Sequence, residues 1–503
     1  MRHTMEISNL LLKPLKVIVF LTLATYSVSA CTTSPATGEQ VVSFNSLEDE
    51  KRIGQREHPK IVKQFGGEYT DPKITAYVRD LGNRLAAVSE LPNIGWTFTV
   101  LNSDQINAFA IPGGFIYVTR GLMALAENEA ELAGVMSHEI GHVTALHSSS
   151  RQATGTAAGL GALAAGILFG RAGAELGSVV GQASVGRYSQ SQEFEADSLG
   201  VRYLSRTGYN THAMASFLSK MRANSQLQNK LLGRPENAVD QYSIFASHPR
   251  TKERVERAIK QASAARSGNR LGKVDYMETL HGMVFGDDPD QGVIRGRDFI
   301  HPALRFRFRV PDGFRLINNP LNVVAAGPGG AVIQFDMDVQ PRRGAMTSYL
   351  QNVWAAKAQL PFVEPLRVNG LDGATGARQI RRRDGVFDLR FVAVRQNSQR
   401  IFRMLFLTPQ RLTRQLSVGL RRTTFSLRTI SEREAAAVKP WRLAVRPVIR
   451  GDTVSGFARQ MAVHSFKEDT FRVLNGLGPA DKLRTGQLVK IVTDRPVSRK
   501  PGS

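Results

Sequence analysis

The sequence predicts an α+β protein made of three folded units. The chain has 503 residues, which is enough for two or three domains at about 100–200 residues each. Apolar residues recur at helical spacing in the first half, alternate with charged residues after residue 298, and form a short βααβ pattern near the end. We therefore expect a mainly helical domain with a small sheet, an α+β domain with an antiparallel sheet, and a small βααβ domain.

The expected boundaries follow changes of composition and periodicity along the chain. They are 1–30 for a signal peptide, 31–47 for a tether, 48–265 for the first domain, 266–297 for a linker, 298–432 for the second domain, 433–444 for a linker, 445–493 for the third domain and 494–503 for a tail. A hydrophobic fraction of 42% is ample for buried cores.

The N-terminus has the pattern of an exported lipoprotein. Lys13 and Lys16 precede the apolar run 17–28, which is too short to remain as a spanning helix and is typical of a signal peptide. Cys31, the one cysteine of the chain, follows small residues, as in a bacterial lipoprotein cleavage box. We expect Cys31 to carry the lipid, the alternative being an ordinary cleavage site followed by a buried thiol. A single cysteine also excludes an internal disulfide.

The chain is strongly basic, with a formal net charge of +23. Arginine is concentrated in the C-terminal half, for example at Arg305, Arg307 and Arg309. Such a field attracts polyanions, but export argues against nucleic acid as the partner. Anionic lipopolysaccharide, phospholipid head groups and cell-wall polymer fit an exported protein better, and a merely solubilising surface is the alternative.

The first domain begins with helical periodicity and continues as a small sheet. Residues 48–89 follow the helical pattern, and 96–101 alternate as a strand. Residues 108–118 give further strand, interrupted by Pro112-Gly113-Gly114. An edge strand here would hold an extended peptide through main-chain hydrogen bonds; a plain structural hairpin is the alternative.

A H-E-x-x-H pattern lies inside a predicted helix from Asn128 to about His147. Four residues turn a helix through about 400°, so His138 and His142 project from nearly the same face. They are one turn apart, as two ligands of one zinc ion need to be. Glu139 then lies beside the metal.

The same helix has a start signal and an apolar side. Asn128 followed by Glu131 predicts a capping box at its first turn. Five apolar residues at helical intervals would bury the side opposite the histidines: Leu132, Val135, Met136, Ile140 and Val143.

A second predicted helix offers a third ligand. Glu193 and Asp197 are four residues apart and so share one face of it. Catalytic zinc has three protein ligands, an open fourth position and a carboxylate that orients a ligand imidazole. We expect Glu193 to complete a His2Glu site for one zinc ion per chain and Asp197 to brace it. A solvated acidic helix face is the alternative.

Residues 154–186 form a Gly/Ala-rich stretch. Its uninterrupted apolar run, 157–170, is shorter than the roughly 20 residues that a spanning helix requires. We expect a helical hairpin that acts as a lid over the cleft; ordinary helix packing is the alternative.

The C-terminal half shows strands and short helices. Residues 304–310 alternate between apolar residues and arginine, which predicts a half-buried strand. Further strands are expected at 331–339, 387–394 and 400–408, with helices at 346–359 and 410–424. Residues 445–493 predict the small βααβ domain.

Four segments in order resemble the zinc metallopeptidase family of HtpX and the CAAX prenyl proteases, and more closely its soluble periplasmic, BepA-like branch. They are residues 107–121, the H-E-x-x-H helix, the helix with Glu193 and Asp197, and Ser247-His248-Pro249 with Arg254. They lie within residues 50–262, less than half of the chain. The second domain faintly resembles the PsbP-type fold. The third resembles a LysM domain, a fold that binds glycans containing N-acetylglucosamine.

The resemblance implies a zincin-like first domain with zinc endopeptidase activity. Glu139 would be the general base. His248 would stabilise the oxyanion or occupy the open metal position, a histidine in a surface turn being the alternative. The substrate would bind along Asn107, Ala108, Phe109 and Ala110. Arg254 would form a structural ion pair, and we expect His147 to be a capping or packing residue. The chain has Ser189-Gln190 where relatives often have Ser-Arg, which puts a substrate or structural contact in doubt.

The predicted function is that of a lipid-anchored periplasmic endopeptidase acting on misfolded or stalled envelope proteins during outer-membrane assembly. Thr32 after Cys31 resembles the sorting signal of the outer membrane, whose inner face is the expected location. Expected partners are these substrates, the outer-membrane assembly machinery and, through the LysM-like domain, peptidoglycan; docking alone is the other role open to that domain. The alternatives are a zinc-dependent chaperone or assembly factor with little proteolysis, and a peptidoglycan-binding scaffold.

Overall fold

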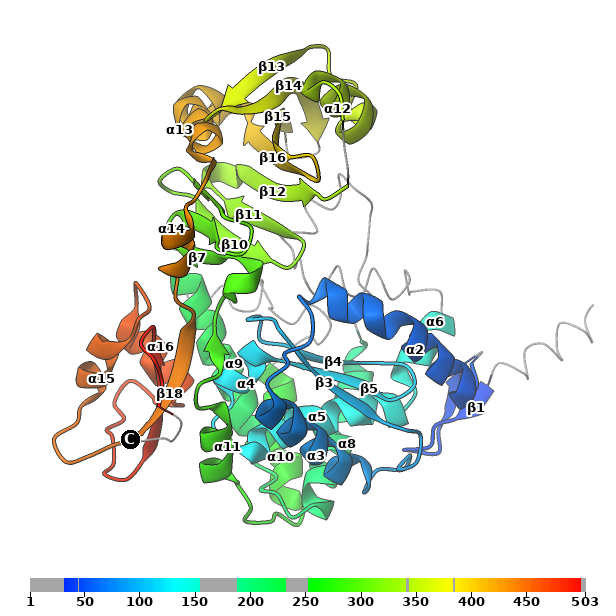
Figure 1. Ribbon diagram of the computed structural model, residues 1–503. Helices are drawn as coiled ribbons and strands as arrows, with labels where there is room; N and C mark the ends of the chain where they lie inside the picture. The colour runs from blue at the N-terminus through cyan, green and yellow to red at the C-terminus, as the bar shows by residue number, and fades with distance from the viewer. Residues whose placement is uncertain are drawn as a thin grey trace, which may run out of the picture.

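The computed structural model describes residues 31–43, 45–153, 188–231, 252–340, 343–382 and 385–498. Helices and several separate sheets alternate along the chain, in agreement with the expected α+β class. Figure 1 shows a helical body, a sheet-rich unit above it and a small C-terminal unit against its side. The expected signal peptide, the expected lid and His248 lie outside the described residues.

The segment expected as a tether is folded. β1 (Cys31–Thr33) and β2 (Gln40–Val42) pair as an antiparallel hairpin. Between them, the carbonyl of Ala36 accepts a hydrogen bond of 3.3 Å from Arg202 of the helical body. The chain therefore already contacts the helical body close to Cys31.

Two helices and a three-stranded sheet form one side of the helical body. The helices are α2 (Leu47–Gln64) and α3 (Pro72–Ala86), and the strands are β3 (Thr97–Leu101), β4 (Ala108–Ile111) and β5 (Phe115–Thr119). The strand order is β3-β5-β4, with β3 parallel and β4 antiparallel to β5. The predicted helical segment, strand and hairpin are thus confirmed, and β4 lies at an edge of the sheet.

The remaining helices of the body are α5 and the helices packed around it. They are α4 (Arg120–Leu125), α5 (Glu129–Thr144), α6 (His147–Ala153), α8 (Gln190–Arg206), α9 (Ala213–Leu231) and α10 (Lys252–Ala264). Every residue of α5 except Val135 is buried, so this helix is enclosed on all sides, whereas the sequence predicted one buried face. Across the described ranges, we find no helix with the length and apolarity needed to cross a membrane.

The segment expected as a polar linker packs into the helical body. It contains α11 (Lys273–Leu280), β6 (Val284–Phe285), η2 (Pro289–Gln291) and β7 (Val293–Arg295). Tyr276 of α11 is fully buried, and its hydroxyl donates to the carbonyl of Met123 at 2.7 Å. Arg120, which is 2% exposed, donates to the carbonyls of Val284 and Gly286 at 2.8 and 3.2 Å. These bonds fix the segment to the start of α4.

The sheet-rich unit consists of two antiparallel sheets. Its strands are β8 (Asp298–His301), β9 (Phe306–Arg309), β10 (Arg315–Asn319), β11 (Asn322–Ala326), β12 (Val332–Asp338), β13 (Val363–Val368), β14 (Leu371–Arg382), β15 (Gly385–Asn397), β16 (Arg400–Pro409) and β17 (Arg428–Thr429). Their orders are β10-β11-β12-β16-β15-β14-β13 and β17-β9-β8-β7. The short helices are η3 (Pro328–Gly330), α12 (Met346–Tyr349), η4 (Leu350–Trp354), η5 (Ala356–Ala358), η6 (Gln410–Leu412), α13 (Thr413–Ser426) and α14 (Glu432–Ala436). One aromatic core joins both sheets through Phe299, Phe306, Phe308, Phe335 and Phe402.

The arginine face of this unit is engaged in ion pairs. In β9, Phe306 and Phe308 are buried while Arg307 and Arg309 point outward, which confirms the predicted alternation. Both arginines contact Asp298 at 2.6 Å, and Arg305 contacts Glu432 at 2.6 Å. The three arginines singled out as an anion-binding pattern thus already have carboxylate partners.

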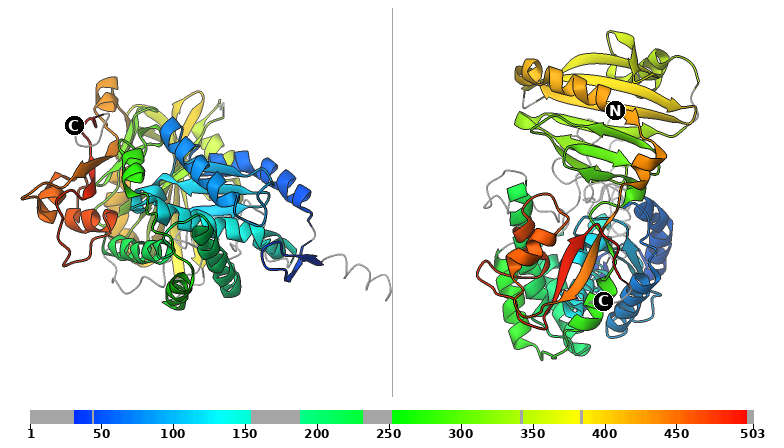
Figure 2. Two further views of the ribbon diagram at one scale, coloured as in Figure 1. Left: turned by 90° about the horizontal axis from the view of Figure 1, so that it is seen from below. Right: turned by 60° about the vertical axis from the view of Figure 1, so that its left-hand side comes forward.

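The C-terminal unit has the predicted βααβ order. It consists of β18 (Trp441–Pro447), α15 (Val454–Gln460), α16 (Lys467–Leu474) and β19 (Leu488–Thr493), and β6 completes its sheet in the order β19-β18-β6. Leu443, Phe471 and Val492 belong to the same hydrophobic core as the helical body. The unit is therefore packed against the body, as both views in Figure 2 show.

Candidate metal centre

The helix that carries the H-E-x-x-H pattern begins at the predicted residue. The side chain of Asn128 caps α5 by accepting from the backbone N–H of Glu131 at 3.0 Å. The expected capping box is incomplete, because the Glu131 carboxylate accepts from the backbone of Glu127 at 2.8 Å and from buried Lys220 at 2.7 and 2.8 Å. The ion pair between Glu131 and buried Lys220 is stronger than the hydrogen bond that a capping box would provide.

Two glycines bring α8 against α5. A Cβ on Gly141 would lie 3.1 Å from the Cβ of Leu199, and one on Gly200 would lie 3.2 Å from the backbone nitrogen of His138. Larger residues at these positions would push the two helices apart. The close packing places Glu193, in the first turn of α8, opposite the two histidines of α5.

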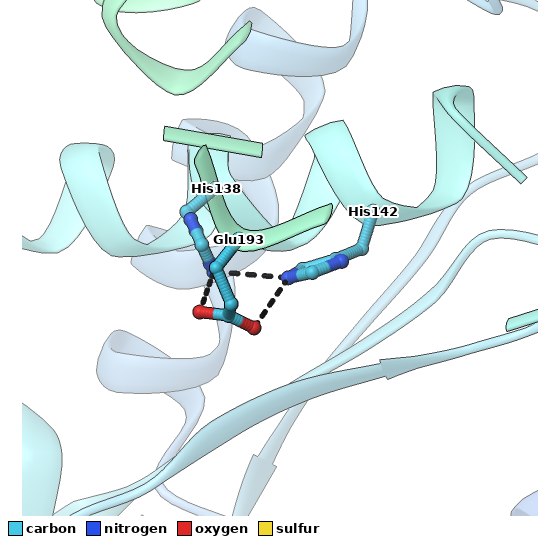
Figure 3. A group of neighbouring side chains, drawn as sticks. All are labelled: His138, His142 and Glu193. Carbon is cyan, nitrogen blue, oxygen red and sulfur yellow. Dashed lines mark hydrogen bonds and ion pairs between the residues drawn. The ribbon is translucent and has the colours of Figure 1, made fainter. Parts of the chain in front are cut away.

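His138, His142 and Glu193 converge on one point (Figure 3). The two Nε2 atoms are 3.0 Å apart, and the Glu193 carboxylate oxygens lie 3.8 Å from His138 Nε2 and 3.5 Å from His142 Nε2. Tetrahedral zinc with bonds of about 2.0–2.1 Å requires separations of roughly 3.3 Å between ligand atoms. All three residues are at most 6% exposed. The donor set and its spacing fit a divalent metal such as zinc.

Asp197 and Arg254 hold the His138 ring in position. Asp197 Oδ1 lies 2.9 Å from His138 Nδ1, so that the Nδ1–H donates to the carboxylate and Nε2 is left for a metal. Arg254 donates to the same carboxylate at 2.6 and 2.8 Å and also pairs with Glu193. Burial alone would raise the pKa of Asp197, but the charges of Arg254 and His138 and their hydrogen bonds together outweigh burial and lower it. The expected roles of brace and ion pair agree with this geometry.

His147 supports the second histidine in the same way. Its Nδ1 lies 2.8 Å from His142 Nδ1, and its Nε2 lies 3.2 Å from Glu195 Oε2. If His142 Nε2 faces a metal, His142 Nδ1–H donates to His147, which in turn donates to Glu195. This hydrogen bond lowers the pKa of Glu195. Tyr188 stacks on the His142 ring with centroids 3.8 Å apart.

Sequence reasoning missed three of these supporting residues. We expected His147 to be a capping or packing residue, and we assigned no role to Glu195 or Tyr188. The H-E-x-x-H helix ends at Thr144, and Leu146 adopts a left-handed conformation with φ of 58°. That turn carries His147 back toward His142. A further histidine soon after the pattern was the one signal available.

Glu139 and the edge strand β4 face the same cavity. Glu139 is 2% exposed and lines the cavity together with His138. Ala108 of β4 forms part of the same wall, and Asn107 to Ala110 are each at most 3% exposed. The edge position of β4 agrees with the expectation. Gln190, at the departure from the family pattern, donates to Glu253 at 2.9 Å.

Comparisons with known proteins agree with this centre. Residues 72–262 match the model of peptidase family M48. The chain is similar to the beta-barrel assembly-enhancing proteases of Yersinia pestis and Escherichia coli (strain K12), with 33% identity over 217 residues and 31% over 247. These alignments cover 41% and 46% of this chain and 43% and 48% of those proteins.

Two further matches are more distant, one in sequence and one in structure. The mitochondrial metalloendopeptidase OMA1 of Schizosaccharomyces pombe is 26% identical over 212 residues, which is 42% of this chain and 60% of that protein. A structure of cyanobacterial PsbP from Synechocystis sp. PCC 6803 aligns with 27% of this chain and 98% of that chain at 12% identity. Its TM-score of 0.23 is too low to assign a fold.

The chain spans less than half the length of the bacterial relatives that it matches. The matched region nevertheless contains the whole metal centre, from the H-E-x-x-H helix through Glu193 to Arg254. Residues 72–262 of this chain are therefore a domain of peptidase family M48.

Proposed function

We propose that this protein is a zinc-dependent metalloendopeptidase of the bacterial cell envelope. The observation that carries the proposal is the buried cluster of His138, His142 and Glu193, whose ligand atoms all lie within 4.8 Å of one another. The M48 domain and the similarity to proteins named as proteases and metalloendopeptidases support it.

The three residues would hold one zinc ion through the two Nε2 atoms and a Glu193 oxygen. When bound, zinc supplies a Lewis acid beside the scissile carbonyl and lowers the pKa of water there toward about 7. Burial lowers the pKa of His142 well below its ordinary value, which keeps the imidazole in the neutral form that a ligand needs. Asp197 and His147 hold the two rings in the required orientation.

Glu139 is the proposed general base. It follows His138 directly on α5, and its carboxylate faces the cavity that His138 also lines. The carboxylate takes a proton from the attacking water and delivers it to the nitrogen of the leaving amine as the C–N bond breaks. An extended substrate would lie along the edge strand, at Asn107, Ala108, Phe109 and Ala110, and pair with its main chain.

We also propose misfolded or stalled envelope proteins as substrates, with a role in outer-membrane assembly. Similarity to proteins named beta-barrel assembly-enhancing protease supports this. A lipid on Cys31 would anchor the protein to the inner face of the outer membrane. The β1–β2 hairpin contacts the helical body, so such an anchor would keep the M48 domain close to the membrane surface. Peptidoglycan is the proposed glycan partner of the LysM-like unit.

Glu139→Gln tests the proposal because it keeps the metal ligands and removes the base. Wild type and this variant should each carry about one zinc per chain by elemental analysis, while a His138→Ala, His142→Ala, Glu193→Ala variant should carry none. Peptide hydrolysis should fall by about 100- to 10,000-fold in Glu139→Gln. Glu278→Gln, an exposed position on α11, is the matched control and should behave as wild type.

The same pair of variants separates the two main candidate functions in cells. Proteomic comparison of envelopes should show specific proteins accumulating in Glu139→Gln but not in Glu278→Gln. An unchanged envelope with function retained in Glu139→Gln would instead assign the protein as a zinc-dependent chaperone or assembly factor.

A further inference from the structure

An apolar cavity of about 50 Å³ lies beside the proposed general base. Its walls include Val135 of α5, Leu218 of α9 and Ala108 of β4, and its polar side includes His138 and Glu139. The cavity is thus continuous with the catalytic residues and touches the edge strand proposed to hold the substrate main chain.

Helix α9 builds the apolar wall with one face. Met214, Phe217, Leu218 and Met221 all line the cavity, at the spacing of residues on a single helix face. Gly134 lets this face come close, because a Cβ there would lie 3.3 Å from the Cα of Met214. The wall is therefore a consequence of how α9 packs on α5.

Two of the charged residues in the wall, Arg254 and Asp197, neutralise each other. Arg254 and Asp197 both line the cavity and are joined by two hydrogen bonds, of 2.6 and 2.8 Å. A charged substrate side chain that entered would lose its water without gaining a free partner of opposite charge in this pair. The lining instead favours an uncharged, aliphatic group.

We propose that this cavity binds an aliphatic side chain of the substrate directly next to the scissile bond, and so sets cleavage specificity. The proposal rests on the proposed endopeptidase function. A dry cavity of about 150 Å³ holds a benzene molecule, so one of about 50 Å³ suits side chains of the size of alanine or valine. The substrate class is an extended segment with a small aliphatic residue at the cleaved bond.

A panel of quenched fluorescent peptides tests the proposal. The peptides share one sequence and differ only at the residue before or after the scissile bond, which carries Gly, Ala, Val, Phe or Asp. At one of these two positions, wild type should cleave the Ala and Val peptides at least about tenfold faster, in kcat/KM, than the Phe and Asp peptides. Equal rates across the panel at both positions would overturn the proposal.

Leu218 provides the matched variants. Leu218→Ala widens the cavity and should raise the rate ratio of Phe to Val peptides by about tenfold, whereas Leu218→Phe should lower the ratio of Val to Ala. Leu227→Ala is the control, because Leu227 lies on the same helix, is similarly buried at 6% against 8%, and does not line the cavity. A shift of the Phe-to-Val ratio in Leu227→Ala equal to that in Leu218→Ala would overturn the proposal.

Binding of the same peptides to Glu139→Gln, measured by calorimetry, keeps the two proposals distinguishable. The Val peptide should bind more tightly than the Phe and Asp peptides. If wild type cleaves no peptide but this binding order holds, the endopeptidase proposal and the role in cleavage specificity fail, and the cavity remains only a binding site for a small aliphatic side chain. If peptides are cleaved and bound without preference, only the cavity assignment fails. If the peptides are neither bound nor cleaved, both proposals are overturned.

Discussion

Hydrogen bonds run from His142 to His147 and from His147 to Glu195. They orient the His142 ring, a role that the sequence positions of His147 and Glu195 do not reveal. A metal-binding imidazole is held in its tautomer by the partner of its other nitrogen. Asp197 fulfils that task for His138 with a carboxylate. For His142 the partner is a second imidazole, which passes the interaction on to Glu195.

Loss of His147 should therefore weaken metal binding without removing a ligand. We expect His147→Ala to lower zinc affinity by about 10- to 100-fold, the usual effect of removing such a partner. Competition with a chromophoric chelator measures it. His212→Ala, an exposed histidine before α9, should leave the affinity unchanged; equal affinities in the two variants would contradict the role of His147.

His248 stays a prediction at this scale, because it lies outside the described residues. If it occupies the open metal position at rest, His248→Ala should raise the hydrolysis of protein substrates, which is the outcome we expect. If it stabilises the oxyanion, kcat should instead fall by about 100-fold or more. A peptidase assay separates the two, and unchanged activity would reject both.

At the scale of elements, Lys490 of β19 joins the C-terminal unit to the end of α4. It is fully buried, and its Nζ donates to the carbonyls of Ala124 and Ala126 at 2.6 and 2.7 Å. These carbonyls lie at the C-terminal end of α4, where a helix leaves acceptors without partners of its own. Burial lowers the pKa of Lys490 to about 7, and both the amine and the ammonium carry N–H donors.

Lys490→Met should leave those buried carbonyls without their donor. We expect the free energy of unfolding to fall by about 1–3 kcal/mol, measured by urea denaturation at pH 7. Lys482→Met is the matched control, because Lys482 is an exposed lysine of the same unit, and it should change stability by less than about 0.5 kcal/mol. A Lys490→Met variant as stable as the control would show that the contact does not hold the unit.

At the scale of the whole molecule, the C-terminal unit packs against a partly buried ionic junction of the helical body. Glu127, between α4 and α5, contacts Lys220 of α9 at 2.7 Å and also Lys273 of α11. Gly476 lies against this junction, since a Cβ there would be 2.6 Å from Glu127 and 2.8 Å from Lys220. The unit therefore docks on the segment that leads into the metal-binding helix.

Acid should weaken this junction. Burial alone would raise the pKa of Glu127, but Lys220 and Lys273 outweigh burial and lower it to about 2 from an ordinary value of 4.5. A lowered carboxyl pKa contributes stability that is present above pH 4.5 and lost as pH falls toward 2, on the order of 3 kcal/mol in total. Unfolding experiments between pH 7 and 2 should show a smaller loss in Glu127→Gln than in wild type. Identical pH profiles would contradict the assignment.

The periodic parts of the fold were predictable because their rules are local. Helical pitch alone places His138 and His142 on one face, and strand alternation alone separates Phe306 and Phe308 from Arg307 and Arg309. The βααβ order near the C-terminus could likewise be predicted from the sequence. The position of Glu193 in the centre was inferred from ligand chemistry, not from any local rule.

The remaining features depend on residues far apart in the chain. Leu146 turns His147 back toward His142, two glycines set the distance between α5 and α8, and Lys490 meets carbonyls 364 and 366 residues earlier. Side-chain periodicity states which face of an element is buried but not which element covers it. The sequence by itself thus determined the proposed metal-ligating residues and the strands that alternate. Only tertiary packing decided what orients those ligands, what lines the cavity and what holds the C-terminal unit.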